Sequence, residues 1–406
     1  MSDDEVTGAP LAGYRIVELG VWVAGPAGGG ILADWGADVI KIEPPEGDPG
    51  RMFQAIMGGE DMPGNPPFEL DNRGKRSVML DLSTEAGRER ALELIATADV
   101  FLTNIRTSAL ARLGLDRETL CARFPQLVYA LVTGYGLKGP DADAPAYDIA
   151  AYWARSGLVS LLAPPGAPLP FQRGGMGDHT VGMAAAAMVS AALASRAKTG
   201  HGRFVATSLF RQGTYTVGFD INTSLMWGRP ISLGRRETMG NPTINNYTAG
   251  DGRRFWVVGL EASRHWGPMA RAVGHPEWAE PGHPYATPAG RFTNAEEVIA
   301  ALDAIFATRS LAEWAEVFAT EEDFFWAPVN TVDDLLADEQ FHASGAIVVV
   351  PDEEGGIPML ATPVDWDGHT PIPRFRAPKL GEHTEEVLAE LDQRAKAASA
   401  PQAASS

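Results

Sequence analysis

The N-terminal half of the chain alternates between short apolar runs and longer segments whose apolar residues recur at helical spacing. Helices are predicted over residues 84–97 and over the alanine-rich segment 181–198, and strands at residues 14–19, 37–43, 77–81, 99–104 and 127–132. Strands that are apolar on both faces and alternate with helices are typical of a parallel sheet covered on both sides. We therefore expect an α/β fold with a Rossmann-like large domain.

The pattern changes after about residue 207. Residues 222–240 have no clear period and contain many turn formers, whereas Asp251-Gly252 between two apolar runs predicts a hairpin. A smaller α+β domain inserted into the large one accounts for this order. The expected boundaries are 1–207 for the first part of the large domain, 208–240 for a linker, 241–325 for the small domain, 326–394 for the return to the large domain and 395–406 for a disordered tail.

Composition narrows the classes of function. A chain of 406 residues is long enough for two domains, and its net charge of −19 argues against nucleic acid as a partner. The single cysteine, Cys121, excludes a disulfide framework, and no His and carboxylate cluster has metal-ligand spacing. The N-terminus is acidic and polar, and the apolar stretch 181–194 is too short to span a bilayer. We expect a cytoplasmic protein without a metal or a membrane partner.

A glycine-rich segment, residues 25–30, follows the first predicted strand. Its spacing is Gly-x-x-Gly-Gly-Gly, which is not the Gly-x-Gly-x-x-Gly of dinucleotide-binding proteins, although Glu43 has the position of a ribose-binding acid. A tight packing turn is the favoured interpretation, and a nicotinamide or flavin site is the alternative.

Basic and polar side chains gather near predicted strand ends. Arg73, Lys75 and Arg76 lie in a turn before a strand, where they could clamp a phosphate or simply be solvated. Asn104 and Arg106 close the strand at 99–104, and ligands bind at the carboxyl ends of parallel strands.

Asp178 is the sharpest single candidate for chemistry. It follows four residues that include three glycines and precedes the alanine-rich helix, so a role as helix cap is the simple alternative. The glycines leave space for a ligand, and we expect the positive end of the helix to keep the carboxylate ionised and nucleophilic. His179 is interpreted as a surface residue at the start of the helix.

Together these segments resemble the class III coenzyme A transferase family, which also contains the α-methylacyl-CoA racemases. The resemblance covers about residues 10–391 and is carried by LAGYRIVELG, LADWGADVIKIEPPEGD, NRGKRSVMLDL, ADVFLTNIRTSALARLGL, GYGLKGP, GGMGDHTVGMAAAAMVSAALASRAKTGHGRFV, APVNTVDDLLADEQFHASGAI and APKLGEHTEEVL. The order and length of these stretches make the resemblance far more specific than any short motif.

The resemblance implies a CoA site and an interlocked homodimer. Asp178 matches the catalytic aspartate of the family. Three segments match the CoA-binding segments of the family: the pantetheine loop at Val23 and Ala24, the basic turn at Lys75 and Arg76 near the nucleotide phosphates, and the Asn-x-Arg segment at Asn104 and Arg106. One departure is Pro44, which stands where many relatives have a basic residue.

The implied activity is transfer of coenzyme A from an acyl-CoA to a free carboxylic acid through an aspartyl-CoA intermediate, as in formyl-CoA transferases. The main alternative is racemisation of a 2-methylacyl-CoA, for which racemases of the family use a His-Asp pair. Tyr147 stands in the place of that histidine and, with an ordinary pKa near 10, is a poor base at neutral pH. A non-catalytic CoA-binding protein is the third possibility, and the presence of Asp178 argues against it.

Overall fold

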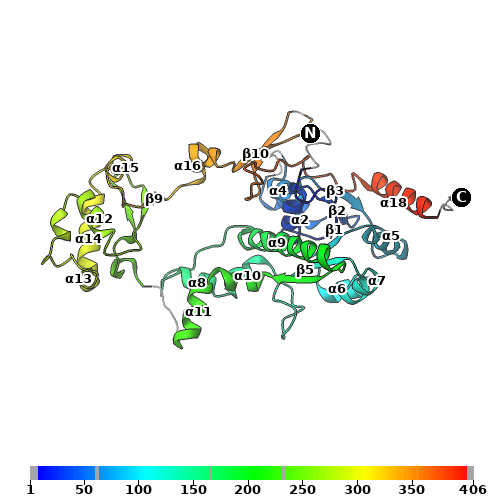
Figure 1. Cartoon of the computed structure of the whole chain (residues 1–406), viewed down its shortest axis with the longest axis horizontal. Helices are drawn as coiled ribbons and strands as arrows, with labels where there is room; N and C mark the ends of the chain where they lie inside the picture. The colour runs from blue at the N-terminus through cyan, green and yellow to red at the C-terminus, as the bar shows by residue number, and fades with distance from the viewer. Residues whose placement is uncertain (1–7, 60–63, 165, 230–233, 354, 400–406) are drawn as a thin grey trace. The chain divides into compact units, whose positions relative to one another are not determined.

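The computed structural model describes residues 8–59, 64–164, 166–229, 234–353 and 355–399. These residues form two compact units (Figure 1). The larger unit runs to residue 162 and continues through residues 169–229 and from residue 342 onward, and the smaller unit comprises residues 163–168 and 230–341.

A six-stranded parallel sheet forms the centre of the larger unit, in the order β3-β2-β1-β4-β5-β6. Its strands are β1 (Arg15–Leu19), β2 (Asp38–Glu43), β3 (Arg76–Met79), β4 (Val100–Thr103), β5 (Val128–Thr133) and β6 (Phe204–Ser208). In sheets of this order, ligands bind beyond the carboxyl ends of the strands where the order reverses, here between β1 and β4. The predicted α/β fold with a Rossmann-like large domain is confirmed.

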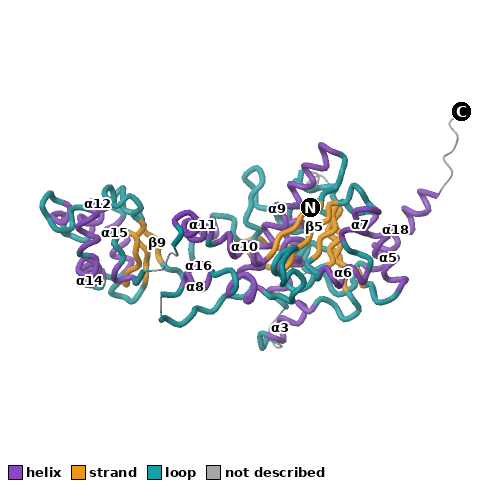
Figure 2. The backbone as a smooth tube through the Cα atoms, turned by 90° about the horizontal axis from the view of Figure 1, so that it is seen from below, coloured by secondary structure: helices purple, strands orange, loops and turns teal. Residues whose placement is uncertain are grey.

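Helices cover both faces of this sheet. Residues alternate along the strands, so that Ile16 packs in one apolar layer and Val17 in the other. The first layer contains α2 (Ala24–Asp34) and α9 (Met176–Thr199), and the second contains α5 (Glu85–Ala96), α6 (Thr107–Leu113), α7 (Arg117–Arg123) and α18 (Thr384–Ser399). Figure 2 shows the strands between α9 on one side and α5, α7 and α18 on the other.

The helix α9 is longer than the predicted segment. It has 24 residues, and by length and composition alone it is long and apolar enough to cross a membrane. In the larger unit it is a core helix, because Ala186 and Val189 are fully buried in the layer that also contains Val128 and Ala130 of β5.

Short elements complete the larger unit. They are η1 (Pro49–Met52), α3 (Phe53–Ile56), α4 (Pro66–Asn72), η2 (Ile149–Ala154), α8 (Leu158–Leu162), α10 (Leu209–Thr216), α11 (Gly218–Trp227) and the antiparallel pair β10 (Ile347–Val350) and β11 (Ile357–Leu360). Several of these carry residues of the site described below.

The smaller unit has its own aromatic core. Tyr247, Phe255, Trp266, Phe306 and Phe318 are buried together in it. An antiparallel sheet is formed by β7 (Ile244–Thr248), β8 (Arg254–Val258) and β9 (Trp326–Pro328), and the helices are η3 (Arg236–Thr238), α12 (Trp266–Ala272), η4 (Pro276–Ala279), α13 (Pro288–Thr293), α14 (Ala295–Phe306), α15 (Leu311–Phe318) and α16 (Val332–Ala337), with α17 (Glu339–Ala343) at its boundary.

The unit boundaries differ from the predicted ones in three places. Part of the predicted linker is helical, because Ser208 caps α10 by accepting the N–H of Arg211, and α11 follows. The predicted return at residue 326 begins with β9, which pairs with β8, so the smaller unit extends to residue 341. The predicted tail begins inside α18, which continues to Ser399. Residues 230–233 of the linker and 400–406 of the tail lie outside the described residues.

Candidate active site

Asp178 lies in the first turn of α9, and a different side chain caps this helix. The N-cap residue is Gly175, whose φ of +71° lies in the left-handed region. As a glycine, it has no side chain that could cap the helix. An oxygen of Asp148 accepts the N–H of Gly177 at 3.0 Å and the N–H of Asp178 at 3.3 Å. The interpretation of Asp178 as the cap is therefore wrong. Its carboxyl group accepts no hydrogen bond from the described residues and remains partly exposed.

Gly177 allows Asp148 to reach the helix end. A Cβ at residue 177 would collide with a carboxylate oxygen of Asp148 and with the ring of Tyr152. Gln172 donates a hydrogen bond of 2.7 Å to the other oxygen of Asp148 and fixes its orientation. A glycine directly before Asp178 is thus a packing requirement of the cap.

The pKa of Asp178 does not follow the expectation that the helix end keeps this group fully ionised. Burial raises the pKa of the Asp178 carboxyl to about 7, and the carboxylates of Asp148 and Asp71 add to the effect. Repulsion and desolvation thus outweigh the helix dipole, whose influence is modest. Among the residues that the structure describes, no group of three or more His, Cys, Asp or Glu side chains is arranged to hold a metal ion.

His179 is part of an ion pair rather than a simple surface residue. Its Nε2 atom lies 3.1 Å from an oxygen of Asp71, which α4 holds in the interior with 4% of its side chain exposed. The hydrogen bond with Asp71 raises the pKa of His179, and in its protonated form His179 favours the ionised form of Asp178. The first turn of α9 therefore contains a carboxyl group next to an imidazole that partly offsets the charges of Asp148 and Asp71 when it is protonated.

A cavity of about 450 Å³ lies next to this turn within the larger unit. It is lined by Asp71, Arg73, His179, Met183 and segments around residues 344–346 and 360–365. Asp178 is not among the lining residues, although it is partly exposed and its neighbour His179 lines the cavity.

Val23 and Ala24 form the junction between β1 and α2. Both are buried, and the loop before them is held by Asn104, which accepts the N–H of Val21 at 2.9 Å and donates to its carbonyl at 2.8 Å. A Cβ at residue 25 would lie 2.9 Å from the Asn104 amide carbon, so this close approach requires Gly25. The structure thus brings the predicted residues Val23, Ala24 and Asn104 together at the carboxyl end of β1.

Arg106 lies at the start of α6, at the same edge of the sheet. It is exposed, and its guanidinium group makes no hydrogen bond or salt bridge with the described residues. Of the predicted CoA-binding cations, Arg106 is the one placed to meet an anionic ligand.

Lys75 and Arg76 are placed differently from the prediction of a phosphate clamp. Lys75 is fully buried, and its three donors are bonded to Glu18 at 2.8 Å, the Pro26 carbonyl at 2.8 Å and the Asn72 side chain at 3.0 Å. The Arg76 guanidinium is bonded to carboxylates of Asp38, Glu386 and Glu390. Lys75 has no donor left for a phosphate, and Arg76 makes four bonds with its five N–H groups, so these contacts do not support the interpretation of this turn as a phosphate clamp.

The glycine-rich segment belongs to the helix α2 and not to a loop. A Cβ at residue 28 would lie 3.0 Å from the Ala185 methyl of α9, one at residue 29 would collide with Glu18, and one at residue 30 would lie 2.8 Å from the Asp71 carbonyl. The glycines let α2 approach α9, α4 and a buried carboxylate. This agrees with the predicted packing role of the segment, but the segment is helical and not the predicted turn.

Sequence reasoning missed several residues that shape the site. Asp148, which follows Tyr147, and Asp71, which precedes the basic turn, were not predicted as site residues. Lys41 stands in the middle of the apolar run of β2, and Asp48 follows it in a turn; both are buried. A charged residue inside an otherwise apolar strand is the signal that could have revealed Lys41.

The comparisons with known proteins agree with this fold. The family model described as CoA-transferase family III matches residues 11–384. The chain is 33% identical to (R)-2-hydroxy-4-methylpentanoate CoA-transferase of Clostridioides difficile, over 94% of this chain and 95% of that protein. It is also 33% identical to cinnamoyl-CoA:phenyllactate CoA-transferase of Clostridium sporogenes, over 94% and 93%.

A solved structure of a CAIB/BAIF family protein from Brucella suis superposes with a TM-score of 0.82 at 31% identity, covering 95% of this chain and 100% of that one. The family model spans the larger unit from β1 to the start of α18 as well as the smaller unit. The chain therefore belongs to CoA-transferase family III.

Proposed function

We propose that the protein transfers coenzyme A from an acyl-CoA thioester to a free carboxylic acid, and that Asp178 carries the coenzyme A between them. The observation that supports this role is the state of the Asp178 carboxyl group. It is partly exposed, it has no hydrogen-bond partner among the described residues, and another acid caps its helix. A carboxyl group that packing does not require is available for chemistry.

The proposed reaction balances without ATP or a metal. The Asp178 carboxylate attacks the thioester carbonyl carbon, the carbon–sulfur bond breaks, and a mixed anhydride and CoA thiolate form. The thiolate then attacks the aspartyl carbonyl carbon, which forms an aspartyl-CoA thioester and releases the donor acid. The acceptor carboxylate repeats these steps in reverse, leaving as its CoA thioester and restoring Asp178.

The donors that stabilise the oxyanions are not the N–H groups next to Asp178. Those of Gly177 and Asp178 are bonded to Asp148, and that of His179 is bonded to the Gly175 carbonyl at 2.8 Å. Since transition-state donors must be free to bind the developing charge, they come from other groups in the assembled site.

The decisive experiment traps the covalent intermediate. Wild-type protein incubated with an acyl-CoA donor and then with hydroxylamine or borohydride should carry a modification on Asp178, located by peptide mass spectrometry. Two donors of the panel, cinnamoyl-CoA and 2-hydroxy-4-methylpentanoyl-CoA, are chosen from the names of the two relatives above. A third donor, succinyl-CoA, adds the thioester of a dicarboxylic acid. Asp178→Ala and Asp178→Asn should lower transfer by at least about 1,000-fold, and Asn is the matched control because it keeps the shape. The proposal fails if every donor leaves Asp178 unmodified.

Racemisation at the α-carbon is kept as a second candidate because two carboxyl groups lie together at the start of α9. Asp148 accepts the Asp178 N–H, and its charge helps raise the pKa of Asp178, as in pairs that divide acid and base roles. Tyr147, which replaces the expected histidine, has 62% of its surface exposed and is a weak base. Incorporation of deuterium from solvent into a 2-methylacyl-CoA would support racemisation, and its absence removes this candidate.

We further propose that the active protein is a homodimer. Large apolar side chains on α10 and α11 are exposed in the single chain: Tyr215, Phe219, Leu225, Met226 and Trp227 are each at least 65% exposed. Such a face is covered in soluble oligomers, and a second copy is the occupant that the family resemblance implies. Light scattering of the wild-type protein should give twice the monomer mass. The Phe219→Asp variant should give the mass of a single monomer. A monomeric wild-type protein with full activity would contradict this proposal.

A further inference from the structure

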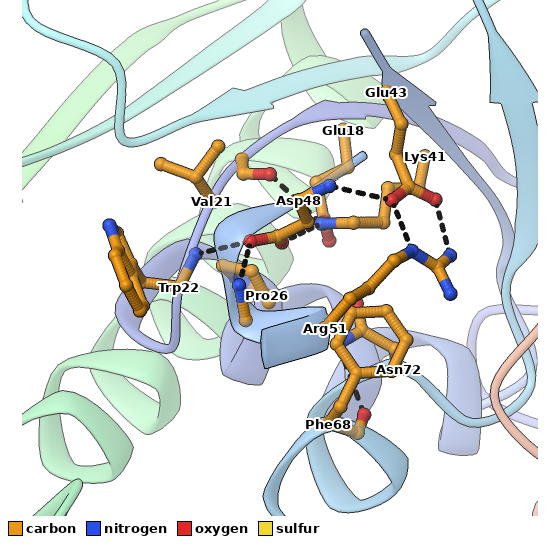
Figure 3. Close-up of polar contacts among 12 residues, drawn as sticks. Glu18, Val21, Trp22, Pro26, Lys41, Glu43, Asp48, Arg51, Phe68 and Asn72 are labelled. Carbon is orange, nitrogen blue, oxygen red and sulfur yellow. Dashed lines mark hydrogen bonds and ion pairs between the residues drawn. The ribbon is translucent and has the colours of Figure 1, made fainter. Parts of the chain in front are cut away.

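A cluster of buried charges lies beneath the loop between β1 and α2. Glu18, Lys41 and Lys75 have no exposed surface, and Asp48 has 2%. Lys41 donates to Glu18 at 3.0 Å and lies 2.8 Å from Asp48, while Lys75 lies 2.8 Å from the second oxygen of Glu18. Figure 3 shows Glu18, Lys41 and Asp48 converging from β1, β2 and the segment that follows β2. Two lysines and two acids thus balance in charge.

Such a cluster is poorly explained by stability alone. Removing four charges from water costs more than their attraction commonly returns, and apolar replacements of buried ion pairs are often neutral or stabilising. Buried charges that persist are best accounted for by what they hold in place. The atoms that this cluster contacts therefore indicate its purpose.

The cluster and one neighbouring amide hold the polar backbone atoms of residues 20–22. Lys41 donates to the Gly20 carbonyl at 2.8 Å, and Asn104 binds both the N–H and the carbonyl of Val21. Asp48 accepts the N–H of Trp22 at 2.9 Å (Figure 3). Three side chains from three different segments thus fix three successive residues directly after β1, at the point where ligands bind in sheets of this order.

Trp22 is the residue in this loop with an unfavourable backbone. Its φ is +64°, and only one other non-glycine residue among the described ones has a positive φ. A bulky residue in the left-handed region is strained and persists where surrounding groups over-determine it. The carboxylate of Asp48 is the group that holds the Trp22 N–H, and Asp48 is itself fixed by Lys41 and by its bond to the Gly50 N–H at 2.8 Å.

The indole ring of Trp22 lies beside the segment that supplies the cap of the candidate active-site helix. The Trp22 ring lies 5.6 Å from the ring of Phe53 and 6.1 Å from that of Tyr147. Tyr147 directly precedes Asp148, which binds the Asp178 N–H. A continuous set of contacts therefore runs from the buried charges through Trp22 to the helix turn that carries Asp178. One edge of this aromatic group is open, since Tyr147 is exposed and Trp22 is only partly buried.

From this geometry we propose that Asp48 is a positioning residue for the reaction at Asp178, acting by holding Trp22 in its left-handed conformation so that the indole ring forms a fixed wall of the acyl site. Lys41 supports Asp48 in this role. The inference rests on the proposed function, and it adds a residue to that function which lies outside the reacting groups.

The test is a double-mutant cycle on Asp48 and Trp22, measured as kcat/KM for the donor and acceptor pair that gives the highest wild-type rate in the panel above. Asp48→Asn keeps the shape and removes the charge, Trp22→Ala removes the ring, and Trp22→Phe keeps an aromatic ring. Asp34→Asn is the matched control, because Asp34 also forms a fully buried ion pair, with Arg73 at 2.7 Å, that does not contact the loop.

We expect Asp48→Asn and Trp22→Ala each to lower kcat/KM by about 100-fold, the loss typical of a misplaced site, and the double variant to lose no more than either alone. The kcat/KM of Trp22→Phe should stay within about threefold of the wild-type value, and the kcat/KM of Asp34→Asn should equal the wild-type value. Losses that multiply in the double variant, or a fully active Trp22→Ala, would overturn the inference, and the second outcome does not require Asp48→Asn to fold. If the wild type transfers CoA with no donor, the proposed function fails instead.

Discussion

At the scale of single residues, the site depends on the surroundings of one carboxyl group. The positive end of α9 favours an ionised Asp178, but burial and the charges of Asp148 and Asp71 raise its pKa to about 7. The group is then about half ionised at neutral pH. A nucleophile with this pKa retains much of its basicity while a large fraction is in the reactive form, which suits attack on a thioester.

This pKa predicts a pH dependence of activity. Because the attacking form is the carboxylate, kcat/KM should rise with pH through a midpoint near 7 and level off above it. An unperturbed aspartate would give a flat profile above about pH 5. The profile should be measured between pH 5 and pH 9 with a fixed donor, and with wild-type stability recorded over the same range. A flat profile would show that the neighbouring acids do not act on Asp178 as described.

The raised pKa of Asp178 also predicts that the free energy of unfolding falls as pH rises, whereas activity rises. A carboxyl group whose pKa is raised in the folded state binds more protons there than in the unfolded state, so folding loses free energy as pH rises from about 4 to 7. Replacing Asp178 by Asn removes this penalty. Asp178→Asn should therefore be more stable than the wild type at pH 8, by roughly 2 kcal/mol after solvent screening, and equal to it near pH 4. Urea denaturation at both pH values measures the difference, and a variant less stable at pH 8 would contradict it.

At the scale of elements, the start of α9 depends on a cap supplied from a distant segment. Asp148 binds two N–H groups of the first turn and also contributes charge to Asp178. These two roles can be separated by substitution, since asparagine keeps a hydrogen-bond acceptor and alanine does not.

Two Asp148 variants should therefore differ in stability but agree in pH dependence. Asp148→Ala should lower the free energy of unfolding by about 1 kcal/mol through loss of the cap, whereas Asp148→Asn should lose less. Both remove a negative charge, so in both the midpoint of the pH profile should move below that of the wild type. Thermal unfolding and pH profiles of residual activity provide the two measurements. An unchanged midpoint in both variants would mean that burial alone sets the pKa of Asp178.

Element by element, the sequence predicted what depends on local pattern and missed what depends on distant partners. Five of the six strands of the large sheet and most of the helix α9 were predicted because their neighbours along the chain define them, whereas β6 was not predicted. Lys75 and Arg76 were misinterpreted because their partners are far away in sequence: Glu18 is 57 residues from Lys75, and Glu390 is 314 residues from Arg76. The sequence alone does not show whether a basic side chain forms an ion pair with an acidic residue in the folded protein.

At the scale of the whole molecule, the negative average of the chain conceals a balanced interior. The net charge of −19 is a property of the surface and of the sequence as a whole, whereas Glu18, Lys41, Asp48 and Lys75 pair fully in the core. An anionic CoA ligand must therefore be met by local cations that remain free, such as Arg106. Composition identifies the global field, but only the packing identifies which charges face a ligand.

The boundaries of the smaller unit lead to a prediction about independent folding. Its aromatic core is internal to residues 234–341, and β9 closes its sheet by pairing with β8. Trp326 of β9 also packs against Phe255 and Phe318, at ring distances of 6.2 and 5.2 Å. A fragment of residues 234–341 should therefore fold alone with a cooperative thermal transition, because its core and sheet are complete.

The matched control is the fragment 241–325, which has the boundaries that the sequence predicted. It lacks β9, so the edge of β8 and one side of Phe255 lose their cover together with the partly buried Trp326. Removal of a fully buried aromatic side chain costs about 3 to 5 kcal/mol, which is the upper bound for the packing lost with Trp326. Such a loss is comparable to the whole stability of a small domain, so this fragment should show no cooperative transition. Circular dichroism melts of the two fragments measure the difference. Equal melting of both would show that β9 belongs energetically to the segment that follows it and not to the smaller unit.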